Sequence, residues 1–217
     1  MELPIKDRKT AGKALAEALR GYRKRDDVIV LGLPRGGVPV ALEIARSLDA
    51  ELDMMLVRKL GTPGHTELAM GAIASNGNRV MNDDVVRGLL ISEDTIKRVE
   101  KEERKELKRR ERAYRGDRAP PVLHDRCVIL VDDGLATGAT MRAAVGAVRQ
   151  DKPSRLIVAV PVAPPDTIAI LRKQVDEVIC LATPVPFMAI GAWYVNFSQV
   201  SDDEVRRMLD KAWCEPA

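Results

Sequence analysis

Short, continuous apolar runs alternate with amphipathic stretches along most of this chain. The runs are rich in Val, Ile and Leu, which is typical of strands covered on both faces of a parallel sheet. They occupy residues 28–31, 52–57, 127–131, 156–162 and 175–181. Apolar residues at helical spacing lie before and between them, at residues 7–20, 40–48, 143–149 and 164–174. This alternation predicts an α/β fold with a doubly wound, mostly parallel sheet.

The stretch between the second and third runs departs from this alternation. Residues 68–74 and 79–81 are predicted to be strands joined at Asn76-Gly77, a strong hairpin turn. A short helix is expected over residues 83–90, and Ser92 is placed to cap a long, charged helix that ends at about Arg115. We therefore expect one domain over residues 1–217, in which residues 82–120 form a helical insertion.

The long helix carries many charges and few apolar residues. Acidic and basic residues interleave along it, which predicts a solvated helix with ion pairs between successive turns. A basic group near its end raises the alternative of a nucleic-acid surface; this group comprises Lys108, Arg109, Arg110, Arg112 and Arg115. The interspersed acids and the lack of aromatic residues among the bases argue against that alternative.

Composition narrows the class of protein. Hydrophobic residues make up 46% of the chain and aromatic residues 3%, so the core is expected to be aliphatic. The net charge of +3 does not demand a nucleic-acid partner. Three scattered cysteines without a C-x-x-C motif indicate reduced thiols and a cytoplasmic setting. No signal-peptide pattern opens the sequence and no apolar run approaches the ~20 residues of a membrane span, so we expect no membrane partner.

The most informative stretch is CVILVDDGLATGAT, residues 127–140. A buried strand is followed by Asp132 and Asp133, and then by a small-residue loop that enters a helix. The N-terminus of a helix is an anion site, because its N–H groups are unpaired and its macrodipole is positive there. Two carboxylates beside it suit a ligand that also offers hydroxyls or a metal ion. A sugar phosphate with a Mg²⁺-bound diphosphate meets both needs.

A second strand, glycine loop and helix occur at residues 28–48, with the loop sequence GLPRGGVP. The adjacent glycines Gly36 and Gly37 expose backbone N–H groups, and Arg35 offers a forked set of donors to an anion. Arg58 and Lys59 follow the next predicted strand. Ligands of open α/β sheets bind at the carboxyl ends of the strands, so these basic residues are expected at the same edge.

Together, these stretches resemble the type I phosphoribosyltransferases, which bind 5-phosphoribosyl 1-diphosphate (PRPP). The resemblance covers about residues 28–181. Within the family, the overall pattern of the chain is most similar to a poorly characterised microbial branch. It implies that Asp132 and Asp133 hold the ribose 2′- and 3′-hydroxyls. It assigns the 5′-phosphate to Ala136, Thr137, Gly138, Ala139 and Thr140. It also assigns the diphosphate to Arg35, Gly36 and Gly37, with a cis peptide bond between Pro34 and Arg35.

The same resemblance implies further parts of a site. Residues 60–67 look like the mobile catalytic loop, and Arg58 and Lys59 join Asp132 and Asp133 as catalytic candidates that would contact the leaving diphosphate. Mg²⁺ would be held through the substrate, with Asp132 and Asp133 nearby. A hood segment over residues 183–200 would bind the acceptor, with Phe187, Trp193 or Tyr194 stacking on a planar ring. Members of the family are usually homodimers.

We therefore expect a Mg²⁺-dependent phosphoribosyltransferase that moves the 5-phosphoribosyl group to a nitrogen nucleophile, such as a nucleobase, and releases diphosphate. Two alternatives remain open. One is a PRPP-binding regulatory protein that contacts nucleic acid through the long helix. The other is a Mg²⁺-dependent phosphotransfer protein built on Asp132 and Asp133, which leaves the Arg35-Gly36-Gly37 loop without a role.

Overall fold

The computed structural model describes residues 2–214, and the side chains of these residues apart from 65–67. Seven α-helices are present within this range: α1 Arg8–Ala18, α2 Gly37–Leu48, α3 Asp83–Gly88, α4 Glu93–Arg115, α5 Ala139–Gln150, α6 Pro165–Leu171 and α7 Asp202–Cys214. The strands are β1 Val28–Gly32, β2 Glu51–Met54, β3 Val57–Thr62, β4 His65–Ala74, β5 Arg79–Met81, β6 Cys127–Val131, β7 Arg155–Val162 and β8 Glu177–Ala182. Two short 3₁₀ turns cover Arg20–Tyr22 and Ile190–Trp193.

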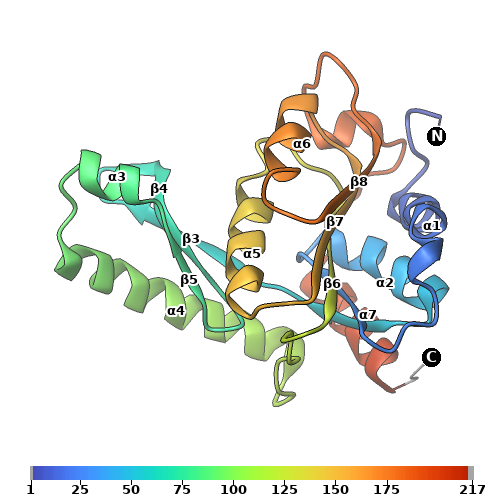
Figure 1. Ribbon diagram of the computed structural model, residues 1–217, viewed down its shortest axis with the longest axis horizontal. Coiled ribbons are helices and arrows are strands. Elements are labelled where there is room, and N and C mark those ends of the chain that lie inside the picture. Colours follow the sequence, from blue (N-terminus) through green and yellow to red (C-terminus); the bar gives the residue numbers. More distant parts are fainter. Residues whose placement is uncertain (1, 215–217) are drawn as a thin grey trace.

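Five of the strands form one parallel sheet in the order β2-β1-β6-β7-β8 (Figure 1). The chain moves from β1 toward one edge through α2, and from β6 toward the other edge through α5. Neighbouring β1 and β6 are therefore the topological switch point of the sheet. This arrangement confirms the predicted α/β fold with a doubly wound sheet.

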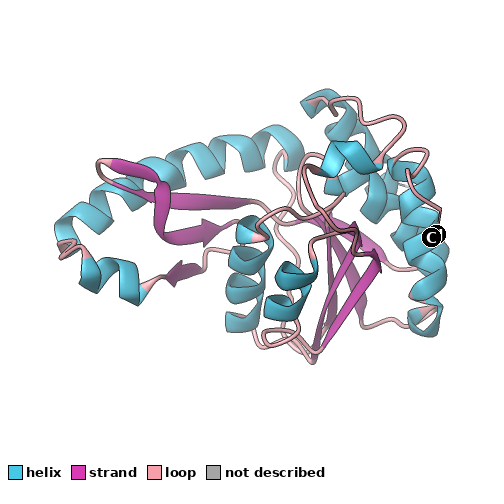
Figure 2. Cartoon of the chain, turned by 90° about the horizontal axis from the view of Figure 1, so that it is seen from above, coloured by secondary structure: helices cyan, strands magenta, loops and turns pink. Residues whose placement is uncertain are grey.

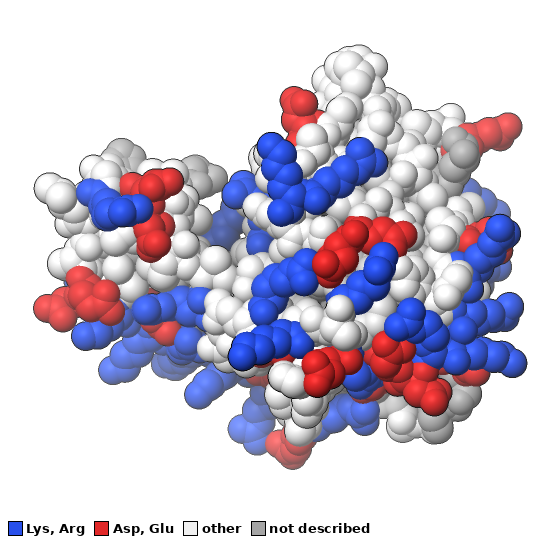
Figure 3. All heavy atoms as spheres, in the orientation of Figure 1, with Lys and Arg blue, Asp and Glu red and all other residues white. Residues whose placement is uncertain are grey.

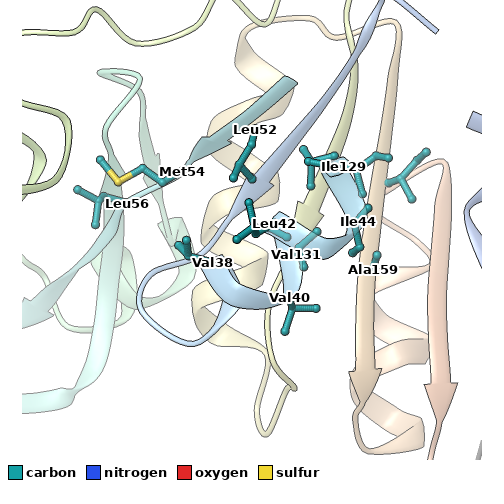
Figure 4. Packing of buried hydrophobic residues seen from close by; sticks show 14 of the residues in the cluster. Val38, Val40, Leu42, Ile44, Leu52, Met54, Leu56, Ile129, Val131 and Ala159 are labelled. Atoms are coloured by element: carbon teal, nitrogen blue, oxygen red, sulfur yellow. The ribbon is translucent and has the colours of Figure 1, made fainter. Parts of the chain in front are cut away.

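The two faces of the sheet bury different residues of the same strands. Val28 and Val30 of β1 pack with α1, α2 and α7 on one face, whereas Ile29 and Leu31 pack with α5 and α6 on the other. Figure 4 shows the first of these layers, where α2 presents Val38 to the ends of β2 and β6. Apolar residues at consecutive positions are thus the mark of strands covered on both sides. Within residues 2–214, no helix is both long and apolar enough to cross a membrane.

The apolar run at 52–57, predicted as one strand, serves two sheets. Its first part, β2, pairs with β1, but Val57 already pairs with Ala74 in a second, antiparallel sheet of order β3-β4-β5. The chain turns at Met55 and Leu56, whose N–H groups bond to Gly32 O and Ser75 Oγ. Arg58 and Lys59 therefore lie inside β3, so the expectation that they follow a strand of the parallel sheet was wrong.

Residues 60–67, predicted as a loop, form a hairpin instead. Strand β3 runs to Thr62 and β4 begins at His65, with Pro63 and Gly64 as the turn. Gly64 has a φ of 78°, in the left-handed region that glycine adopts without strain. The predicted hairpin at Asn76-Gly77 is confirmed by the pairing of β4 with β5.

Strands β3–β5 and helices α3 and α4 form a lobe, residues 57–115, that projects from the parallel sheet (Figures 1 and 2). The predicted helical insertion, residues 82–120, contains α3 and α4 and is therefore only part of this lobe and of the segment that follows it. Ser92 caps α4 as expected, by accepting the N–H of Thr95. Ile96, Leu107 and Tyr114 face the core, which continues from the sheet into the lobe.

The end of α4 is fixed by a buried ion pair. Arg115 is 5% exposed, and its Nη1 lies 2.7 Å from Oδ2 of Asp53, which is 1% exposed. Arg115 belonged to the alternative of a basic nucleic-acid surface, and the structure excludes it from such a surface because it is buried and compensates a buried carboxylate of β2. Burial raises the pKa of Asp53, while Arg115 opposes that rise. The pair ties the lobe to the edge of the parallel sheet.

Candidate functional site

The loops that follow β1 and β6 meet at the switch point of the sheet. Leu33 N–H, just past β1, donates to Val131 O at the end of β6 (2.8 Å). The peptide bond between Pro34 and Arg35 is cis, as predicted. The glycine pair that follows lies directly against the two aspartates after β6. The structure thus brings together two stretches that are about a hundred residues apart in the sequence.

Glycine is required at positions 36 and 37 by this close approach. A Cβ atom on Gly36 would lie 1.9 Å from Oδ2 of Asp133. A Cβ atom on Gly37 would lie 2.5 Å from Val131 O and 3.0 Å from the Asp132 Cα. The shortest of these distances at each position is closer than any real contact of a Cβ atom. The two glycines therefore seat one loop on the other, in addition to exposing N–H groups at the start of α2.

The carboxylate of Asp133 is held by a residue far away in the sequence. Arg8 Nε donates to Asp133 Oδ2 (2.7 Å), and Arg8 Nη1 donates to Ser198 O (2.7 Å). The guanidinium carbon of Arg8 also lies 4.0 Å from the centre of the Phe197 ring. Tyr194 Oη donates to Asp133 O (2.6 Å). Arg8 of α1 thus holds the carboxylate of Asp133, and Tyr194 holds its main-chain carbonyl.

The two aspartates differ in how their charge is compensated. Burial and the charge of Asp133 raise the pKa of Asp132 well above its usual range, whereas its bond from Asp133 N–H (2.9 Å) acts in the other direction. Burial also raises the pKa of Asp133, but Arg8 opposes this rise by hydrogen bonding and charge. The negative charge of Asp132 is therefore compensated less well than that of Asp133. Perturbed carboxylates in a partly enclosed setting are typical of functional sites.

The predicted phosphate loop leads into α5 as expected. Ala136, Thr137 and Thr140 are exposed, and Gly138 and Ala139 begin the helix. Gly138 has a φ of 68°, and a Cβ there would lie 2.6 Å from Thr167 Cγ2. Thr167 Oγ1 donates to Ala136 O (2.8 Å), so α6 supports the loop from behind. A helix start of this kind can bind an anion through its N–H groups.

Arg35 points from the β1 loop toward α4 and α7. Its Nη1 lies 3.9 Å from Asp202 Oδ1, which also accepts the Tyr114 hydroxyl (2.6 Å). Burial and Asp202 raise the pKa of Tyr114 to about 12, so this hydroxyl stays protonated as a donor. The Arg35 side chain is 39% exposed and remains accessible to a ligand.

Arg58 and Lys59 lie apart from the paired loops. Arg58 makes an ion pair with Glu103 of α4 (Nη2–Oε2 2.6 Å). Lys59 is exposed in a cleft of about 790 Å³ between the lobe and α5, lined also by Arg142. Figure 3 shows this hollow between the lobe and the body of the molecule. The contact of Arg58 and Lys59 with the diphosphate stays a prediction. It would require the lobe to move toward the paired loops, or the ligand to extend to the lobe.

The aromatic candidates of the hood are mostly packed together. Tyr194 is 6% exposed, and its ring lies against Phe197 (centroids 4.9 Å apart). Phe187 and Trp193 are half-buried, with ring centroids 6.1 Å apart. Burial and the nearby aspartate charge raise the pKa of Tyr194. Tyr194 therefore supports the site from inside, while Phe187 and Trp193 remain closer to the surface.

Arg8 and Thr167 are site residues that the sequence analysis missed. Arg8 contacts a carboxylate 125 positions away, and its local setting is that of an ordinary first helical residue after the N-cap Asp7. Thr167 lies in a helix after a different strand. No local pattern marks either residue, because both act through tertiary contacts.

Glycine loops and a helix start at the switch point of a doubly wound sheet form the arrangement with which α/β proteins commonly bind phosphate groups. A family model described as phosphoribosyl transferase domain matches residues 4–196. The chain therefore belongs to the phosphoribosyl transferase family.

The most informative relatives agree with this family. Two curated Mycobacterium tuberculosis proteins, from strains CDC 1551 / Oshkosh and ATCC 25618 / H37Rv, are provisionally named phosphoribosyl transferases. Each is 48% identical over 206 residues, which is 95% of this chain and 46% of the relative. The chain thus spans less than half the length of these relatives. The crystal structure of TT1426 from Thermus thermophilus is 42% identical and covers 95% of this chain and 98% of its own, with a TM-score of 0.86.

Replacing Asp132 by Asn is expected to stabilise the fold by about 0.5–2 kcal/mol at pH 8. Asn removes a charge that the folded state holds unfavourably and keeps an oxygen to accept the Asp133 N–H. Because the folded-state pKa of Asp132 is raised, the native protein regains this stability as pH falls through that pKa, and the gain of the variant shrinks. Denaturant unfolding at several pH values measures it. Asp133→Asn is the control. It is expected to destabilise the fold, because it leaves Arg8 without its partner carboxylate.

Replacing Gly36 by Ala is expected to destabilise the fold by roughly 1–3 kcal/mol, the usual cost of overpacking. The new methyl group would occupy the place of Asp133 Oδ2 and break its pairing with Arg8. Gly21→Ala is the matched control, because a Cβ at Gly21 meets no atom within 4 Å among the described residues. Equal unfolding free energies of the two variants would show that the loops do not meet as described.

Proposed function

We propose that this domain transfers the 5-phosphoribosyl group from PRPP to a nitrogen nucleophile, such as a nucleobase, and releases diphosphate. Membership of the phosphoribosyl transferase family supports this class of reaction. The single observation that carries it is the contact of Gly36 and Gly37 with Asp132 and Asp133. It brings the predicted diphosphate loop and the predicted ribose carboxylates to one point at the switch of the sheet.

The 5′-phosphate would bind the loop from Ala136 to Thr140. The start of α5 offers backbone N–H groups and the positive end of its dipole. Thr137 and Thr140 are exposed and add hydroxyl donors. Thr167 holds the loop in place through Ala136 O. Binding this phosphate fixes one end of PRPP while the reaction occurs at the other.

Asp132 and Asp133 would accept hydrogen bonds from the ribose 2′- and 3′-hydroxyls. Their negative charge would also favour the positive charge that develops at C1 as diphosphate leaves. The pair fits a Mg²⁺-bound substrate, because Mg²⁺ takes oxygen ligands from one or two carboxylates together with substrate phosphates. Mg²⁺ would neutralise charge on the leaving diphosphate when bound.

The diphosphate would bind the N–H groups of Gly36 and Gly37 and the guanidinium of Arg35. Arg35 is weakly held, at 3.9 Å from Asp202, so it can turn to a ligand at low cost. Lys59 faces the neighbouring cleft, and would contact the diphosphate only if the hairpin of residues 57–74 closed on the site. A lid of this kind would exclude water from the reacting carbon.

The acceptor would bind beside residues 183–200. Phe187 and Trp193 are the aromatic residues there that a planar ring could reach, since Tyr194 is buried. The indole nitrogen of Trp193 is buried with no hydrogen-bond partner among the described residues, so it is a donor available to an acceptor after a small movement. We further propose a homodimer in the cytoplasm, and the three free cysteines support a reducing setting.

PRPP binding by calorimetry, with and without Mg²⁺, tests this proposal. The native chain is expected to bind PRPP more tightly with Mg²⁺, and Asp132→Asn/Asp133→Asn to lose most of that binding. Asp26→Asn/Asp117→Asn removes the same charge at exposed positions and is expected to bind normally. No binding to the native chain, or normal binding to the first double variant, would contradict the proposal.

A further inference from the structure

The long helix α4 has a charge distribution in the structure that its sequence does not show. Four of its glutamates are engaged by arginines of β3, of β5 or of α4 itself. The pairs are Arg58–Glu103 (2.6 Å), Arg79–Glu100 (2.8 Å), Arg104–Glu100 (2.7 Å), Arg109–Glu106 (2.7 Å), Arg110–Glu106 (2.9 Å) and Arg115–Glu111 (3.6 Å). The interleaved acids that argued against a basic surface are therefore largely neutralised within the fold.

Six cations of α4 are left over: five share one face, and the sixth, Arg98, lies about 20° outside it. We call the five the α4 stripe: Lys97, Lys101, Lys105, Lys108 and Arg112. All five are exposed, and none makes a hydrogen bond or salt bridge to a described residue. Their spacing of 4, 4, 3 and 4 residues keeps them within an arc of about 80° over roughly 22 Å of helix. Figure 3 shows basic side chains gathered along the lower edge of the lobe, where α4 runs.

The face is hollowed as well as charged. A shallow groove lies along it, lined by four members of the stripe and by the paired Glu100 and Arg104. Glu93 and Asp94 lie in the first turn of the helix, before Lys97. Glu102 is exposed, but the helical repeat places it about 60° outside the arc. Between Lys97 and Arg112, a linear ligand could therefore lie along the stripe without meeting an unpaired carboxylate within the arc, which Asp94 enters only about one turn before Lys97.

We propose that the α4 stripe binds the phosphodiester backbone of nucleic acid without sequence specificity. Phosphates of one strand repeat about every 3.4 Å along a duplex, so a row of cations of this length meets several of them. Lysine acts as a flexible point charge and does not read base edges as a bidentate arginine does. Among the described residues, no exposed large apolar side chain lies on α4, which disfavours a membrane surface as the partner.

The stripe is independent of the proposed transferase site. None of its residues contacts Asp132, Asp133 or the loop that precedes α5. The helix is nevertheless tied to the core through Arg115 and Asp53, and to Arg35 through the Tyr114–Asp202 contact. Nucleic acid bound to the stripe would thus contact the lobe and leave the carboxyl edge of the parallel sheet free.

The test is fluorescence anisotropy with a labelled duplex of about 25 base pairs, and with a single strand of the same length, over a series of salt concentrations. Binding to five phosphates predicts that log K falls against log[salt] with a slope of about −4.5 on the duplex. Lys101→Gln/Lys105→Gln/Lys108→Gln is expected to reduce the slope by roughly 3 and to weaken binding by about tenfold or more at low salt.

Lys13→Gln/Lys24→Gln/Lys173→Gln is the matched control, because it removes the same charge at exposed lysines outside the lobe. It is expected to keep the native slope. The proposal is overturned by undetectable binding of the native chain, by equal loss in both variants, or by binding of anionic phospholipid vesicles in place of nucleic acid. PRPP calorimetry of the stripe variant is expected to match the native chain, so failure of this inference is separate from failure of the transferase proposal.

Discussion

The structure depends on the contact between the glycine pair after β1 and the aspartate pair after β6. No side chain fits between them, since a Cβ on Gly36 would overlap the Asp133 carboxylate. The contact sets the distance between two loops that leave adjacent strands in opposite directions. It places an anion-binding backbone and two carboxylates at the same point of the sheet edge. The proposed contacts of the two glycines and the two aspartates with PRPP follow from this placement.

Holding two adjacent carboxylates together, with Asp133 buried and Asp132 half-buried, is unfavourable, and the fold offsets only part of this cost. Arg8 compensates Asp133, and Phe197, Ser198 and Tyr194 hold Arg8 and Asp133 in place. Asp132 is left with a raised pKa and little compensation. A ligand that offers hydroxyls or a metal ion to Asp132 would relieve that charge. We therefore expect ionised Asp132 to lower the stability of the free protein, and ligand binding to recover that stability.

Features that depend on residues close together in the chain could be predicted from the sequence. Continuous apolar runs indicated the strands, glycines and small residues indicated the loops, and the cis bond before Arg35 followed from a family resemblance. Tertiary contacts decided the rest. The run at 52–57 is divided because Met55 and Leu56 bond to two different parts of the chain, and this moved Arg58 and Lys59 away from the sheet edge. Arg115 belongs to a buried pair with Asp53, and Arg8 to a pair with Asp133, which no spacing in the sequence marks.

The most direct test of the account is a crystal structure of this chain with PRPP and Mg²⁺. We expect the ribose to lie over Asp132 and Asp133, the 5′-phosphate on residues 136–140, and the diphosphate on Arg35, Gly36 and Gly37. The Arg8–Asp133 pair should persist, because Arg8 approaches the carboxylate from the side of Phe197. Electron density for PRPP elsewhere, for example in the cleft between the lobe and α5, would contradict the account.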